Sequence, residues 1–159
     1  MRLYHGSNVL VEEPRLLHVN KSSDFGRGFY LTSSREQAAR WAELQSKRRK
    51  EGIPMVSIFE IDDAELLDLT VLEYKQADND WLQMITKNRK NIIYEEKFDI
   101  IVGPVADDFT MDVLNLYFSG RYSEEEALKR LLPQKLKDQY VFKTEEAIKR
   151  LEFVGGEKA

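Results

Sequence analysis

Apolar residues alternate with polar residues, or form short runs, in several segments of the chain, a pattern typical of β-strands. We expect the strand beginning at Phe98 to be buried and to end before Gly103 and Pro104, because both residues favour turns. The Gly-Gly pair that opens residues 155–159 predicts a flexible tail. The predicted strands cover residues 2–5, 28–32, 55–61, 66–69, 98–102, 139–143 and 151–154.

Elsewhere apolar residues recur three and four positions apart, the spacing of a helix with one buried face. Ser33 and Ser123 each precede a glutamate by three residues, which predicts a capping box at the start of a helix. Asp78 and Thr144 are further candidate N-caps. The predicted helices run from Ser33 to about Lys50, over 78–90, 110–119 and 123–132, and over a short segment after Thr144.

Strands and helices follow one another without a regular βαβ rhythm, which favours an α+β fold over a doubly wound parallel sheet. The chain of 159 residues contains no linker or repeat, so we expect one domain over residues 1–154. Residues 6–27 are rich in turn formers, including His18 in a polar stretch, and predict a long irregular surface loop. Gly26 and Gly28 precede a strand rather than follow one, which excludes a Rossmann-type phosphate loop.

Composition narrows the classes of function. The chain has no cysteine, which excludes disulfides, thiolate zinc sites and cysteine nucleophiles. Its net charge of −4 argues against a protein that coats nucleic acid. The basic runs at 47–50 and 87–90 are interpreted as solvated faces, with local basic patches as the alternative. No signal peptide and no apolar run long enough to span a bilayer are visible, so we expect a cytoplasmic protein without a membrane partner.

Candidate chemistry lies in two segments. His5 ends a predicted strand and is followed by Gly6, where a ligand can approach the backbone closely. Tyr30 lies on the next strand, and Trp41 follows it by eleven residues on a helix. Each of these side chains has an ordinary interpretation as part of the core. Two facing aromatic rings could also sandwich a flat ligand, and a positively charged nicotinamide ring would gain from the ring faces.

Four segments carry a resemblance that covers nearly the whole chain. They are Tyr-His-Gly-Ser at residues 4–7, Asp-Phe-Gly-Arg-Gly-Phe-Tyr at 24–30, Gly-Pro-Val-Ala-Asp-Asp at 103–108 and Asp-Gln at 138–139. On these segments the chain is identified as a member of a bacterial family catalogued as DUF3990. The first two, with the helix of Trp41, also resemble the nicotinamide pocket of the diphtheria-toxin and poly(ADP-ribose) polymerase branch of ADP-ribosyltransferases, which uses a His-Tyr-Glu triad.

The resemblance implies a role for each matching residue. His5 would hydrogen-bond the ribose attached to adenine, and Gly6 would hold the carboxamide through its backbone. Ser7 would contact the adenosine ribose. Tyr30 would stack on nicotinamide, with Trp41 behind it. The implied fold is a split sheet with peripheral helices.

Other positions complete the implied pocket. Gly28 and Phe29 belong to the predicted strand of Tyr30, and the resemblance implies that they also contact NAD. Arg89 could make bidentate contacts with the pyrophosphate, or it could lie at a solvated helix end. Ala38 stands where the family often has a serine that binds the carboxamide. Asp107, side by side with a second aspartate, is interpreted as a turn former and helix cap, and no metal site is predicted.

Gln139 takes the third position of the triad, where the family pattern has glutamate. A glutamine keeps a hydrogen bond to the ribose but loses the charge. A unit charge about 4 Å away contributes roughly 4 kcal/mol at an effective dielectric near 20, so turnover could fall by two to three powers of ten. Asp138, Glu145 and Glu146 are the neighbouring carboxylates that could compensate.

These implications define three hypotheses. The first is an NAD-dependent mono-ADP-ribosyltransferase that acts on a protein, nucleic acid or small molecule and has NAD as co-substrate. Such proteins are often toxins, effectors or defence proteins, so an antitoxin or regulatory protein is a possible partner. The second is a module that binds NAD or ADP-ribose with little turnover, which Gln139 favours. The third is an RNA 2′-phosphotransferase, which would need a basic pocket.

Overall fold

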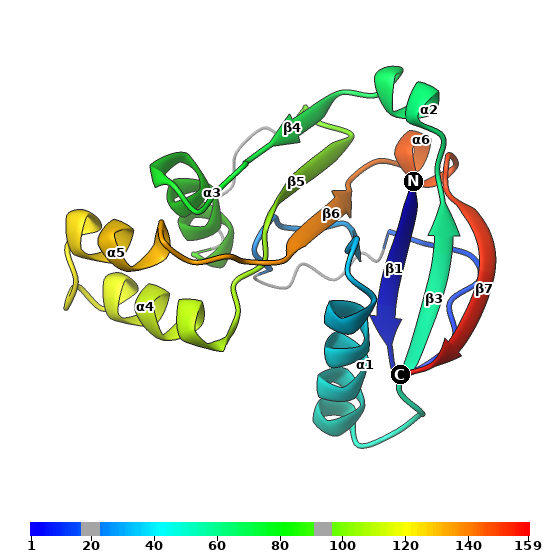
Figure 1. Cartoon of the computed structure of the whole chain (residues 1–159), viewed down its shortest axis with the longest axis horizontal. Coiled ribbons are helices and arrows are strands. Elements are labelled where there is room, and N and C mark those ends of the chain that lie inside the picture. The colour runs from blue at the N-terminus through cyan, green and yellow to red at the C-terminus, as the bar shows by residue number, and fades with distance from the viewer. Residues whose placement is uncertain (17–22, 91–96) are drawn as a thin grey trace.

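A computed structural model describes residues 1–16, 23–90 and 97–159, and shows a mixed fold of the α+β kind (Figure 1). His18 and the middle of the loop expected at 6–27 lie outside the described residues. The strands are β1 (Arg2–Ser7), β2 (Phe29–Leu31), β3 (Met55–Glu60), β4 (Val71–Glu73), β5 (Ile100–Pro104), β6 (Asp138–Phe142) and β7 (Glu152–Lys158). The helices are α1 (Arg35–Arg49), α2 (Asp63–Leu67), α3 (Asn79–Arg89), α4 (Asp108–Phe118), α5 (Glu124–Leu131) and α6 (Glu145–Ile148).

The strands form two sheets that meet along β1 and β2. One sheet has the order β1-β3-β7, and the other has the order β2-β6-β5-β4. All pairings between the described strands are antiparallel except that of β4 with β5. Tyr4 and Thr32 exchange two backbone hydrogen bonds of 2.8 and 2.9 Å and thereby join the sheets. In the described part of the chain, no other backbone hydrogen bond joins β1 to β2, and we call the place beyond this bridge the β1–β2 junction.

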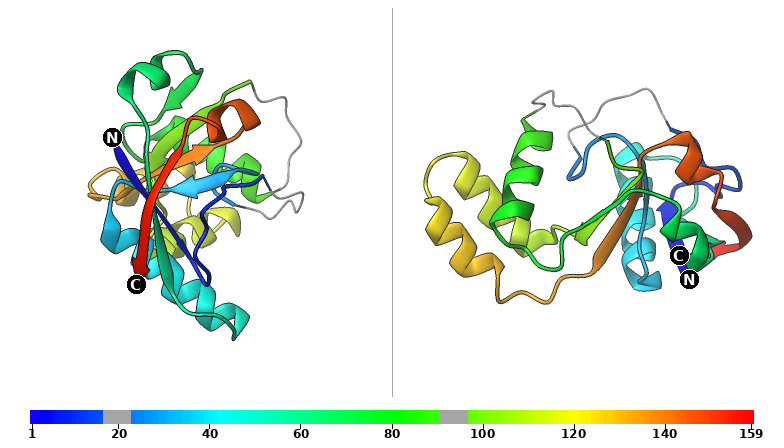
Figure 2. Two further views of the ribbon diagram at one scale, coloured as in Figure 1. Left: turned by 90° about the vertical axis from the view of Figure 1, so that its right-hand side faces the viewer. Right: turned by 90° about the horizontal axis from the view of Figure 1, so that it is seen from above.

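Two hydrophobic clusters lie on either side of β2. Phe29 and Leu31 belong to the first cluster, which includes side chains of β1, β3 and α6. Tyr30, between them in sequence, packs against the second cluster, which includes Trp81 of α3 and side chains of α4 and α5. This is the alternation that a strand between two packed layers requires. In Figures 1 and 2, α3, α4 and α5 lie together at one end, and α1 lies beside β1.

The helix caps follow the sequence closely with one exception. Asp78, Ser123 and Thr144 each accept a hydrogen bond from the backbone of the third residue beyond, as expected of N-caps. The cap of α1 is Ser34 rather than Ser33. Ser33 instead donates to the Asp138 carboxylate through its backbone N–H, at 2.9 Å, and its hydroxyl. A contact from a distant strand therefore displaces the cap by one residue.

Three predicted strand boundaries are wrong. The strand expected at 2–5 continues through Gly6 and Ser7, which pair with β3, so His5 is not its last residue. Residues 66–69 are not a strand, because α2 runs to Leu67 and β4 begins only at Val71. The strand expected at 98–102 is β5, and it continues through Gly103 and Pro104. Both residues pair with β6, and a proline is tolerated at a strand end because its carbonyl still accepts hydrogen bonds.

The expected tail at 155–159 is also wrong, because most of it is the second half of β7. Residues 155–158 pair with residues 55–58 of β3. Gly156 lies under the side chain of Leu10, whose Cδ1 would be 2.0 Å from an added Cβ. Gly156, one of the two glycines that suggested a tail, therefore allows close packing. Among the described residues, no helix has both the length and the apolar character that crossing a membrane requires.

Candidate functional site

His5 lies on β1 with its ring stacked on Phe29, at 4.2 Å between centroids and 24° between planes. Its Nδ1 is 2.7 Å from the backbone oxygen of Tyr30. Because a carbonyl only accepts hydrogen bonds, Nδ1 carries the proton. Burial lowers the pKa of His5 below its usual value, so the ring is neutral near pH 7. No described residue donates to Nε2, which is left as an acceptor.

Gly6 presents backbone groups at the β1–β2 junction. Along an antiparallel strand, alternate residues direct N–H and C=O to opposite edges. Tyr4 faces Thr32, and therefore Gly6, two residues later, faces the same edge beyond the bridge. No described backbone group there bonds to it. A donor and an acceptor on this stretch of backbone, at a residue that is itself buried, match the two ends of a carboxamide.

Helix α1 packs closely against this part of β1. A Cβ on Gly6 would lie 1.8 Å from the backbone oxygen of Ala38. Ala38 is fully buried, whereas Trp41, one turn later, is half-buried. Among the described residues, Trp41 makes no ring contact with Tyr30. The structure thus brings α1 to Gly6 but does not pair the two predicted stacking rings.

Tyr30 is held by the turn that precedes β2. Its hydroxyl donates to the Gly26 oxygen at 2.5 Å and accepts from the Phe25 N–H at 3.1 Å. Burial, and next the Asp24 carboxylate, raise the pKa of Tyr30 far above its usual value. The hydroxyl is therefore a fixed structural contact at neutral pH. Gly28 lies against the Val141 side chain, 2.5 Å from an added Cβ, and so lets β2 approach β6.

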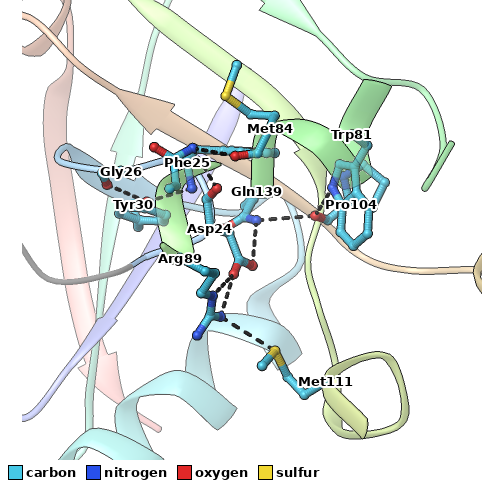
Figure 3. A network of polar contacts seen from close by, with 11 residues as sticks. Asp24, Phe25, Gly26, Tyr30, Trp81, Met84, Arg89, Pro104, Met111 and Gln139 are labelled. Atoms are coloured by element: carbon cyan, nitrogen blue, oxygen red, sulfur yellow. Dashed lines mark hydrogen bonds and ion pairs between the residues drawn. The ribbon is translucent and has the colours of Figure 1, made fainter. Parts of the chain in front are cut away.

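Gln139 is the centre of a buried polar network that Figure 3 shows from close by. Its side chain is 2 % exposed, and its Nε2 donates to Asp24 Oδ2 at 3.3 Å and to the Pro104 oxygen at 3.2 Å. The other Asp24 oxygen accepts from Arg89 Nε at 3.0 Å and Nη2 at 2.5 Å. The indole N–H of Trp81 also donates to Pro104, at 3.0 Å. The network joins the segment before β2 to α3, β5 and β6.

The three predicted triad residues lie on neighbouring strands, because β1 adjoins β2 and β2 pairs with β6. His5 contacts Tyr30 directly. Gln139 is connected to Tyr30 through Asp24 and the turn that holds the tyrosine hydroxyl. All four segments that carry the family resemblance thus meet in one region. Ser7 is buried beside them and is 3.4 Å from the Asn8 side chain.

The carboxylates expected to compensate for Gln139 are engaged elsewhere. Asp138 binds the turn at Ser33. Glu145 and Glu146 lie in α6, beyond the opposite end of β6. The carboxylate next to Gln139 is Asp24, which sequence reasoning missed because it lies 115 positions away. Its presence in the segment 24–30 was the one available signal. Arg89, predicted to reach a pyrophosphate, forms an ion pair with Asp24 while its side chain stays 31 % exposed.

A hollow of about 440 Å³ lies between the start of α1 and the segments that follow β5 and precede β6. Basic and acidic side chains both line it, which suits a polar ligand or group. Its lining residues are Glu36, Gln37, Arg40, Val105, Asp107, Lys135 and Lys137. Asp107 also caps α4 by accepting from Thr110 N–H at 2.8 Å. In the described part of the chain, no three histidine or carboxylate side chains gather in a metal-binding arrangement.

A comparison with family models matches residues 1–153 to a family described as "Protein of unknown function (DUF3990)". No curated protein and no solved structure matches the chain.

Proposed function

We propose that this chain, which belongs to the DUF3990 family, is an NAD-dependent mono-ADP-ribosyltransferase with a split-sheet fold of that enzyme class. The observation that carries the proposal is the approach of His5, Tyr30 and Gln139 on three neighbouring strands. The division of the strands into two sheets that meet at a single bridge also supports it.

The β1–β2 junction would hold the nicotinamide end of NAD. The N–H and C=O of Gly6, to which no described backbone group bonds at this edge, would pair with the carboxamide. The ring of Tyr30 would stack on nicotinamide. His5, neutral and with Nε2 as acceptor, would take a hydrogen bond from a hydroxyl of the adenine-linked ribose. Phe29 fixes the His5 ring by stacking, so its contribution to binding would be indirect.

The transfer would break one bond and form one bond at C1′ of the ribose next to nicotinamide. Nicotinamide leaves with the electron pair of the glycosidic bond, and the acceptor nucleophile attacks C1′ and loses its proton to solvent or a base. The chain would contribute by orienting the ribose and the leaving group, since positioning alone can lower such a barrier by several kcal/mol. The hollow lined by Arg40 and Lys137 lies beside the start of β6 and would admit the acceptor.

The test measures NAD affinity by calorimetry and nicotinamide release by chromatography in Tyr30→Phe and Tyr30→Ala. Loss of the ring should weaken NAD binding about tenfold or more, since an aromatic contact is worth roughly 1 to 2 kcal/mol. Tyr30→Phe keeps the ring and should bind more tightly than Tyr30→Ala. Tyr117→Ala, at a half-buried tyrosine of α4, is the matched control. Equal affinity in all four proteins would exclude this pocket.

Gln139 supports a second candidate function, a module that senses NAD or ADP-ribose without turnover. An amide at this position is neutral and cannot stabilise developing positive charge as a carboxylate does. NAD recovered intact after long incubation at saturating protein, together with affinity that depends on Tyr30, would favour the sensing module. Steady release of nicotinamide would favour the transferase.

A further inference from the structure

The hydrogen bonds of Gln139 determine which way its amide faces. Asp24 Oδ2 and the Pro104 oxygen are both acceptors and lie 3.3 and 3.2 Å from one atom of the amide. That atom must be the nitrogen, because an oxygen there would face two acceptors. Both amide hydrogens are therefore used, and Oε1 lies on the opposite side.

Gln139 Oε1 accepts no hydrogen bond from a described residue. The residue as a whole is 2 % exposed. An otherwise buried amide thus presents one acceptor atom in a fixed direction.

Asp24 is suited to hold this arrangement because a carboxylate offers two acceptor oxygens. One receives the Arg89 guanidinium and the other receives Gln139. An asparagine at position 24 has only one acceptor oxygen, so either Arg89 or Gln139 would face a donor. A glutamate at position 139 would put two carboxylates within hydrogen-bond distance, which disfavours ionisation of both. Asp24 and Gln139 therefore form a matched pair.

We propose that Asp24 is a positioning residue that fixes Gln139 so that Oε1 accepts a hydrogen bond from a sugar hydroxyl. The inference rests on the proposed function for the identity of that sugar, the ribose next to nicotinamide. Asp24 acts through Gln139 and does not touch the ligand. This pairing of donor and acceptor also explains why glutamine stands at position 139 of a chain with an aspartate at position 24.

Four variants test the pair: Asp24→Asn, Gln139→Glu, the exchange Asp24→Asn with Gln139→Glu, and Asp99→Asn as control. The exchange restores an acceptor opposite a donor between positions 24 and 139, because the new asparagine donates to the new glutamate and still accepts from Arg89. It does not restore the bond to the Pro104 oxygen, which an oxygen of the new glutamate would face. The control also removes a carboxylate that joins separate segments, since Asp99 accepts from Thr70 N–H at 2.9 Å and from the Thr144 hydroxyl at 2.7 Å. It is not part of the site network.

The first readout is the side-chain amide signal of Gln139 in nuclear magnetic resonance spectra of the free protein, assigned by its loss in Gln139→Glu. The wild-type protein should show slow hydrogen exchange at this amide. Asp24→Asn should make exchange at least about tenfold faster or shift the signal to that of an exposed amide, and Asp99→Asn should leave it unchanged. Fast exchange in the wild type, or an unchanged signal in Asp24→Asn, would overturn the proposed orientation.

The second readout is nicotinamide release. Asp24→Asn should lower kcat about tenfold or more, since a misplacement of about 1 Å can cost on the order of 100-fold, with a smaller change in KM. In the presence of Gln139→Glu, Asp24→Asn should instead raise kcat, because it replaces one of two facing carboxylates by a donor. A purely structural role of Asp24 would not allow this change of sign. Equal kcat in wild type and Asp24→Asn, or an exchange variant no faster than Gln139→Glu, would contradict the proposal.

The two readouts separate the possible failures. A protected amide that depends on Asp24, in a protein that neither binds NAD nor releases nicotinamide, would disprove the proposed function and the ribose contact. An unprotected amide in a protein that releases nicotinamide would disprove the role of Asp24 and leave the transferase standing.

Discussion

His5 is a histidine whose tautomer and charge are both determined by its surroundings. The Tyr30 carbonyl requires a proton on Nδ1, and burial lowers the pKa of the ring from the usual 6.5. In the unfolded chain the same ring takes up a proton near pH 6.5. The folded protein therefore binds fewer protons than the unfolded chain just below that pH.

Stability should consequently fall as the pH drops below about 6.5, because protons stabilise the unfolded chain in that window. The sign follows from the lowered pKa: above about pH 6.5 the ring is neutral in both states and contributes no pH dependence. The slope from one such group is at most about 1.4 kcal/mol per pH unit. His5→Asn replaces the Nδ1–H by an amide N–H that does not titrate. Urea denaturation of both proteins between about pH 8 and pH 5 measures the difference in slope.

The contribution of other groups cancels in this comparison, because both proteins share them. Parallel curves for the wild type and His5→Asn would mean that His5 titrates alike in the folded and unfolded chain, contrary to its burial.

The site residues differ in how far sequence could reveal them. His5, Gly6 and Tyr30 lie in short motifs in which neighbouring residues determine the local geometry, so the motifs located them. Asp24 acquires its role only through contacts with Gln139 and with α3. No spacing along the chain encodes such contacts, which depend on how the elements pack. For the same reason, proximity in sequence to Gln139 did not identify the carboxylate that contacts it.

Element boundaries also divide into those that local sequence determines and those that depend on distant contacts. The caps Asp78, Ser123 and Thr144 bond to backbone three residues away, and local sequence predicts them. The cap of α1 and the ends of β5 and β7 depend on strands far away in sequence. β7 is the clearest example, because Gly155 and Gly156 have low strand propensity but pair with β3.

Removing residues 155–159 should therefore destabilise the protein, whereas removing a flexible tail would not. The deletion removes four pairings with β3 and the ion pair between Arg35 and Glu157. At about 1 kcal/mol for each lost backbone hydrogen bond, we expect a loss of about 2 to 4 kcal/mol in the free energy of unfolding, measured by urea denaturation. Glu157→Gln, which removes only the exposed ion pair, should cost less than about 1 kcal/mol. A deletion no more costly than Glu157→Gln would contradict the role of β7.

The two sheets have separate contacts to the proposed ligand. Gly6 and His5 belong to the sheet of β1, whereas Tyr30 and Gln139 belong to the other sheet. The clusters on either side of β2 are distinct, and a single bridge of two backbone hydrogen bonds joins β1 to β2. A ligand at the β1–β2 junction would therefore add contacts where the protein itself has few.

NAD should accordingly stabilise the folded protein and protect both strands at the junction. At a free concentration of about 100 times Kd, a ligand that binds only the folded state adds about 2.7 kcal/mol to the free energy of unfolding. Thermal unfolding of the wild type, Tyr30→Ala and Tyr117→Ala, with and without NAD, measures this effect. The wild type and Tyr117→Ala should shift alike, and Tyr30→Ala should shift less because its affinity is lower. Amide hydrogen exchange should slow at Gly6 in the presence of NAD, since the carboxamide would accept its N–H. A thermal shift that is equal in Tyr30→Ala, or one without protection of Gly6, would place the ligand elsewhere and remove the basis for the nicotinamide pocket.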